Sequence, residues 1–105
     1  MEFTEVLTAV REWLAHVPLP AQINRDTDDG LWAYIETENA LAELLAGEGA
    51  YAPYRFVSFT VLDTRLDLHA EPVFSFCDDE SHTIADILRE LDRGMAVMGM
   101  LTGSQ

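Results

Sequence analysis

The spacing of apolar residues changes twice along this chain, and that order constrains its fold more than any other feature. Residues 3–17 carry apolar side chains at i, i+3, i+4 and i+7, the stripe of an amphipathic helix. Residues 54–62 alternate instead, with Val57, Phe59 and Val61 on one face, as in a β-strand. Helical spacing returns over residues 82–98. Helical, extended and again helical segments in one short chain predict an α+β fold.

Both terminal helices carry end signals. Pro18 should end the first helix, because proline cannot supply the next backbone donor. Before the last helix, Asp86 can reach back to Thr83 in a reciprocal capping arrangement. Asp79 and Glu80 would lie near the positive end of that helix dipole. These signals predict where the first helix ends and the last helix begins.

The middle of the chain admits more than one interpretation. Residues 21–30 are predicted to form an acidic loop. The next segment is either a strand at 31–36 followed by a helix at 38–46, or one continuous helix. Strand plus helix is preferred, because Glu38 would interrupt the apolar stripe of a single helix. Gly47 would end the second helix.

Two further extended segments follow the alternating strand. Residues 66–68 alternate on the opposite parity, so a turn or bulge is expected near residues 63–64. Residues 73–77 are apolar at nearly every position, which predicts a central strand with Cys77 buried. The complete expectation is a single α+β domain over residues 1–105. It has about three helices packed on a short, mainly antiparallel sheet.

The charge of the chain favours one class of partner. Nineteen acidic residues face six basic ones, all arginine, for a formal net charge of −13. Such a surface repels nucleic acid and anionic membranes and favours encounter with basic proteins. Life in high salt or GC-rich codon usage are alternative causes, although codon usage explains the missing lysine and not the excess acid. The favoured function is an acidic protein-interaction module, such as an inhibitor, immunity or adaptor protein, that binds a basic partner surface.

Two acidic segments are the expected partner-binding sites, one before residue 31 and one before the last helix. A place in the core is the favoured interpretation for Trp32 and Tyr34; the alternative is that they anchor a partner, since Trp and Tyr are enriched at interface hot spots. The expected partner-binding residues are Asp26, Asp28, Asp29, Trp32, Asp78, Asp79 and Glu80.

Two other functions stay open at this point. One is a small-ligand-binding or enzymatic domain with a pocket between sheet and helices. The other is a structural homodimer. In that dimer the apolar run Met98, Met100 and Leu101 would form the interface, since such a run is rarely left exposed.

Motifs for chemistry are missing from the sequence. It has no glycine-rich phosphate loop and no nucleophile motif, and the acidic stretch 24–30 departs from calcium-loop spacing. Cys77 and His82 have no second ligand pair at zinc spacing. We therefore expect no catalytic residue, metal or cofactor, and the sequence favours a binding module over an enzyme without deciding between them.

The sequence also predicts a cytoplasmic protein. Its apolar runs are too short to span a bilayer, and a single cysteine cannot form an internal disulfide. The acidic N-terminal residues are typical of a helix rather than of a signal peptide.

Repulsion among the carboxylates predicts a salt-dependent stability. Raising sodium chloride from ~20 mM to ~500 mM should raise the melting temperature, because screening weakens repulsion between exposed like charges. Thermal melts followed by circular dichroism measure this. An unchanged or lower melting temperature would mean that the charges are already well paired, and a rise confined to molar salt would favour adaptation to high salt.

Overall fold

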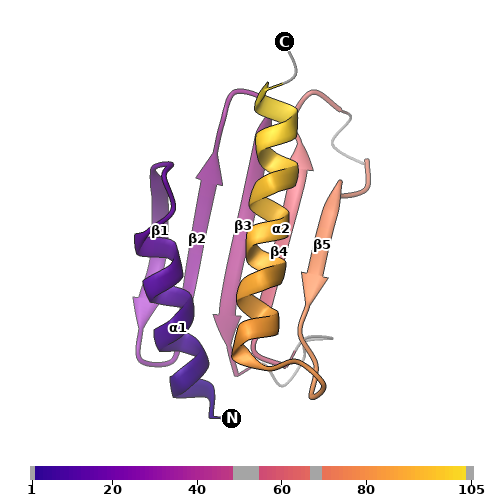
Figure 1. Cartoon of the computed structure of the whole chain (residues 1–105). Helices are drawn as coiled ribbons and strands as arrows, with labels where there is room; N and C mark the ends of the chain where they lie inside the picture. Colours follow the sequence, from indigo (N-terminus) through magenta and orange to yellow (C-terminus); the bar gives the residue numbers. More distant parts are fainter. Residues whose placement is uncertain (1, 49–54, 67–69, 104–105) are drawn as a thin grey trace.

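Two helices lie against one face of a five-stranded antiparallel sheet in the computed structural model, which describes residues 2–48, 55–66 and 70–103 (Figure 1). The strands lie side by side in chain order, as a meander. The elements are α1 (Phe3–Ala15), β1 (Ala21–Thr27), β2 (Gly30–Glu36), β3 (Ala40–Gly47), β4 (Val57–Asp63), β5 (Phe74–Cys77) and α2 (Ile84–Gly103). The α+β class and the antiparallel sheet are confirmed. The prediction of about three helices is wrong, since the described residues form two helices.

The terminal helices form where their sequence signals place them. The apolar stripe of α1 is buried, and the helix ends before Pro18. At the start of α2, the Thr83 N–H donates to Asp86 Oδ2 at 3.0 Å, and the Asp86 N–H donates to Thr83 Oγ1 at 3.2 Å. This reciprocal cap confirms the predicted arrangement. The helix runs to Gly103, beyond the expected end at residue 98.

The predicted helix at 38–46 is wrong, because this segment is β3. Alanine, leucine and glutamate favour a helix in isolation, but tertiary context overrides such propensities. Its residues alternate between buried and partly exposed, and β2 and β4 pair with it on either side. Leu44 is buried on the face that the helices cover, whereas Leu41 and Leu45 are partly exposed on the opposite face. The preceding strand at 31–36 is confirmed as β2.

The edges of the sheet also depart from expectation. Residues 21–27 form the edge strand β1 rather than a loop, with a register shift between Ile23 and Arg25. Exposure of nearly all its side chains removes the apolar alternation that would reveal a strand. The strand at 73–77 was expected at the centre, but β5 lies at the other edge, and Cys77 is exposed. The turn near residues 63–64 is confirmed, and residues 67–69 lie outside the described part.

The core lies between the sheet and the two helices, with Phe59 of β4 at its centre. The ring of Trp13 from α1 meets it edge-on, with centroids 5.8 Å apart, and Phe74 of β5 lies 6.3 Å away. Gly94 brings the backbone of α2 directly against the same ring. A Cβ added at Gly94 would lie 2.5 Å from Phe59 Cε2 and 3.0 Å from Phe74 Cε1. The close approach of α2 to β4 therefore requires glycine here.

We expect Gly94→Ala to destabilise the fold by about 1–3 kcal/mol, because overpacking against a buried ring outweighs the gain in helix propensity. The matched control is Gly99→Ala in the same helix, where an added Cβ has no neighbour within 4 Å. That variant should gain about 0.5–1 kcal/mol. Urea unfolding measures both, and stabilisation by both substitutions would contradict the close packing at Gly94.

Candidate functional site

One face of the sheet is left without a helix, because α1 and α2 both pack on the other face (Figure 1). Within the described residues, side chains that point away from the helices form three rows across the strands. We call this surface the open face. Its rows are Arg25–Trp32–Leu45–Ser58–Cys77, Gln22–Tyr34–Glu43–Thr60–Ser75 and Glu36–Leu41–Leu62. On β2 and β3 the aromatic and leucine side chains of these rows lie beside Glu36 and Glu43. On β4 and β5 the rows carry small side chains, apart from Leu62.

Trp32, Tyr34 and Glu43 form a contact cluster on the open face. The Trp32 Nε1–H donates to Glu43 Oε2 at 3.0 Å, and the two aromatic rings lie 5.7 Å apart at an interplanar angle of 56°. Tyr34 is also the cross-strand neighbour of Glu43. Partial desolvation, and then the nearby Glu43 carboxylate, raise the pKa of the Tyr34 hydroxyl. The cluster therefore combines an exposed aromatic surface with a negative charge.

Two hollows flank this cluster. One, of about 530 Å³, is lined by Pro20, Ala21, Gln22, Tyr34, Glu36 and Leu41. The other, of about 350 Å³, includes Trp32, Leu45, Arg25, Asp29 and Glu48 in its lining. The Trp32–Tyr34 pair therefore separates two depressions large enough to receive side chains or a small molecule.

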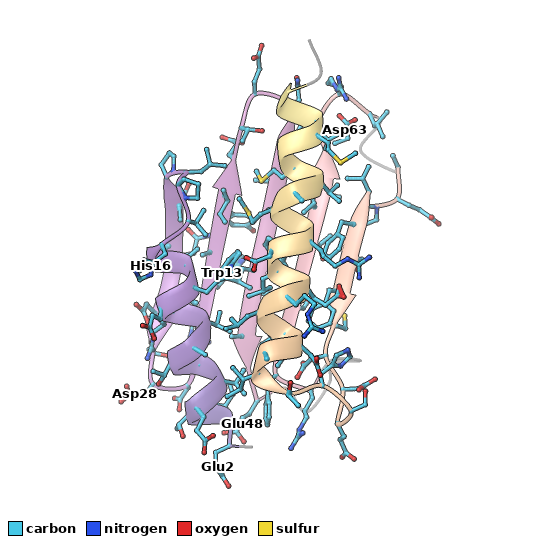
Figure 2. The ribbon with its side chains drawn as sticks, in the orientation of Figure 1. Glu2, Trp13, His16, Asp28, Glu48 and Asp63 are labelled. Atoms are coloured by element: carbon cyan, nitrogen blue, oxygen red, sulfur yellow. The ribbon has the colours of Figure 1, made fainter. Side chains whose placement is uncertain are left out.

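The second hollow continues into a strongly acidic end of the molecule. The start of α1, the β1–β2 turn, the end of β3 and the β5–α2 connection all meet there, because antiparallel strands return to the same end (Figure 1). Figure 2 shows Glu2, Asp28 and Glu48 at this end. We call this region the acidic end; its carboxylates are those of Glu2, Glu5, Asp28, Asp29, Glu48, Asp79 and Glu80.

Most of the arginines neutralise carboxylates elsewhere. Four of the six form ion pairs, in the combinations Arg11–Asp26, Arg65–Asp63, Arg89–Asp86 and Arg93–Glu90. Arg55 lies at the acidic end, but its guanidinium stacks on Phe56, 4.7 Å from the ring centroid. Within the described residues, no arginine forms an ion pair with a carboxylate of the acidic end or with Glu43. Arg25 and Arg55 line the hollows at this end, and His82 Nδ1 lies 3.1 Å from Asp79 Oδ1, but the seven carboxylates outnumber these basic groups.

The structure separates the acidic residues expected to bind a partner into free and engaged groups. Asp28 and Asp29 are exposed in the β1–β2 turn, and Glu80 is exposed before α2. Asp26 Oδ1 instead forms an ion pair with Arg11 Nε at 2.6 Å, and the Arg11 guanidinium also donates a hydrogen bond to the Thr27 carbonyl. Asp26 therefore helps to fix α1 to β1, while the other three remain available at the acidic end.

Asp79 is partly engaged within its own loop. Its Oδ1 accepts from the Ser81 N–H at 2.8 Å, and its N–H donates to His82 Nδ1 at 3.0 Å. Hydrogen bonds from Ser81, and then the proximity of His82, lower the pKa of the Asp79 carboxyl. Asp79 thus orders the turn into α2 and also carries a negative charge at the acidic end.

Asp78 is buried and holds the start of β4 to the end of β5. Its Oδ1 accepts from the N–H groups of Phe56 and Val57, both at 2.7 Å, and its own carbonyl accepts from the Arg55 N–H at 2.8 Å. Its Oδ2 is buried without a hydrogen-bond partner. With no exposed surface, Asp78 cannot contact a partner directly.

The residues expected at a dimer interface lie in different environments. Met98 is fully buried in the core of its own chain, and Leu101 packs against that core while its carbonyl accepts from Asn39 Nδ2 at 3.2 Å. Met100 is 72% exposed. Self-association through this end of α2 stays a prediction, with Met100 as the residue that a second copy could reach.

Sequence reasoning favoured the core for Trp32 and Tyr34 and gave a partner anchor only as the alternative, whereas the Trp32 side chain is 37% exposed on the open face. Assigning residues 38–46 to a helix separated Leu41, Glu43 and Leu45 from the strand beside them. The alternation of buried alanines with these three residues was the signal that could have placed them on one face.

The described part of the chain has no group of three or more His, Cys, Asp or Glu side chains placed to hold a metal ion. Within the same residues, neither helix has the length and apolar character that a membrane span requires. No protein-family model matches the chain, and no curated protein or solved structure matches it either.

The position of Asp78 predicts a structural role. Asp78→Ala should destabilise the fold by about 2–4 kcal/mol, because two backbone N–H groups lose their acceptor at a buried site. Asp28→Ala, which removes the same charge from an exposed turn, should change stability by no more than about 0.5 kcal/mol. Urea unfolding measures the free energy of unfolding of both variants. Equal losses would show that the stabilising effect of Asp78 comes from its charge and not from its hydrogen bonds.

Proposed function

We propose that this protein is a non-enzymatic interaction module that binds a basic segment of a partner protein on its open face and acidic end. Such a module would act as an inhibitor, immunity or adaptor protein. The observation that carries the proposal is the Trp32–Tyr34 pair, partly exposed beside carboxylates that form no ion pair with an arginine among the described residues.

Electrostatics supports the choice of a basic partner. The acidic end gathers carboxylates from four separate parts of the chain, so their potentials add over one region of surface. Charges arranged in this way accelerate encounter with a cationic surface and disfavour anionic competitors. The encounter would thus be guided to the edge of the open face.

The open face supports protein binding after the encounter. Antiparallel sheets with one solvated face usually carry polar residues there. Here Trp32 and Leu62 are 37% and 38% exposed, and Leu41 and Leu45 are partly exposed between them. Aromatic residues beside apolar ones and a polar rim are typical of interface centres.

A small-ligand-binding domain is the second candidate, because the hollow beside Tyr34 has the volume of many ligand sites. It lies on the open face and not between sheet and helices, where a ligand pocket was expected. A homodimer is less favoured, since two surfaces of charge −13 repel each other. The cytoplasmic location also stays a prediction.

The experiment begins with a photo-crosslinking amino acid at Leu45, on the open face, and identification of the captured proteins. For a purified basic partner, association should be slower at ~150 mM than at ~20 mM salt. Neutralising Asp28, Asp29 and Glu48 to their amides should lower the association rate constant by about tenfold.

The matched control neutralises three exposed carboxylates outside the acidic end, Glu12, Glu38 and Glu71, with the same change in net charge. We expect this control to retain most of the original rate. Equal slowing in both variants would contradict binding at the acidic end, and captured proteins without a basic member would contradict the proposed function.

A further inference from the structure

We propose that Trp32, Tyr34 and Glu43 bind the guanidinium group of an arginine in the partner segment. This inference rests on the proposed function and gives its partner a chemical identity: an arginine flanked by apolar residues.

The aromatic pair supplies the first part of such a site. The rings of Trp32 and Tyr34 lie 5.7 Å apart and are inclined by 56°, so they offer two π surfaces at an angle. A cation within about 6 Å of a ring centroid is attracted by the electrons of that ring. The exposed fraction of Trp32, 37%, leaves part of the indole open to a partner.

Glu43 supplies the second part. Its bond to the Trp32 indole N–H fixes the carboxylate beside the rings. The negative charge of Glu43 contributes to the raised pKa of the Tyr34 hydroxyl, because it disfavours the phenolate. The same negative charge favours a cation at this place. A guanidinium is planar, so it can stack on an aromatic ring while donating hydrogen bonds to a carboxylate.

Among the described residues, no arginine forms a cation–π contact with Trp32 or Tyr34 or an ion pair with Glu43. Arg25 is the cross-strand neighbour of Trp32 and lines the adjacent hollow. The cation–π contact found among the described residues is instead that of Arg55 on Phe56, which demonstrates the same chemistry elsewhere in this fold. Arg25 also disfavours a second cation at the outer edge of β1, so the guanidinium should lie toward Glu43.

The two hollows define what flanks the arginine. The hollow beside Tyr34 includes Leu41, and the hollow beside Trp32 includes Leu45. Both leucines are partly exposed, so apolar side chains on either side of the arginine would cover them.

A partner chain fits this site better than a second copy. Four of the six arginines of this protein are held in ion pairs and Arg55 is stacked. The net charge of −13 further opposes self-association, whereas it attracts a cationic segment.

The test uses ¹⁵N-labelled protein and two probes, N-acetyl-arginine amide and its uncharged analogue N-acetyl-citrulline amide, at matched ionic strength. The chemical shifts of the two indole N–H signals report binding near each tryptophan. The Trp32 indole signal should shift saturably as the arginine probe is added, and at least several-fold less with the citrulline probe. Trp13, whose indole donates to Asp92 at 2.8 Å on the helix-covered side, is the internal control and should not move.

Glu43→Gln should raise the dissociation constant of the arginine probe about three- to fivefold, as expected for a partly exposed ion pair. The control Glu12→Gln on α1 should leave this dissociation constant unchanged.

Trp32→Phe, which removes the indole signal but keeps an aromatic ring, assigns the indole N–H resonance of Trp32. An acetylated, amidated Leu-Arg-Leu peptide should bind more tightly than arginine amide if the hollows accept its leucines.

Three results would overturn the inference. Equal shifts with citrulline would remove charge recognition, and shifts confined to the amides of the acidic end would place the cation elsewhere while leaving the proposed function intact. A dimer at ~100 μM in sedimentation equilibrium that Trp32→Ala dissociates would identify the occupant as a second copy. The proposed function fails separately, through a salt-insensitive association rate with the basic partner.

Discussion

The packing around Phe59 determines where everything else in this structure lies. Trp13 of α1 meets the ring edge-on, and Gly94 of α2 allows that helix to approach the same ring closely. Trp13 lies between the two helices (Figure 2), and its indole also donates to Asp92 of α2, so the two helices are joined directly. With both helices held over one ring, a single face of the sheet receives the whole helical layer.

The bare face is the direct consequence of this arrangement. A meander of five strands leaves its second face open unless another element crosses it, and within the described residues none does. The open face carries exposed aromatic and aliphatic groups beside Glu43, and it joins an end where carboxylates gather. Apolar area would supply affinity and the carboxylates would select the sign of the partner, a division of roles that suits protein recognition. Binding itself remains our proposal.

Local signals predicted the elements whose own residues decide their conformation. The stripe of α1, the alternation of β4 and the cap formed by Thr83 and Asp86 all depend on neighbours close in sequence. The elements assigned to the wrong conformation were β1 and β3, and β5 was extended as expected but lies at an edge of the sheet rather than at its centre. In β1 nearly all side chains are exposed, and in β3 helix-favouring residues are held extended by strands on both sides. Neither strand can be recognised without its partners.

The sequence by itself determined the fold class, both terminal helices, the alternating strand β4 and the sign of the net charge, because periodicity and composition are properties of the chain alone. Tertiary structure alone decided which face of the sheet is covered, that Asp78 is buried while Asp28 is exposed, and that Trp32, Tyr34 and Glu43 meet. The reason is physical: strand pairing and helix packing bring together residues whose sequence separation carries no information about their distance in space.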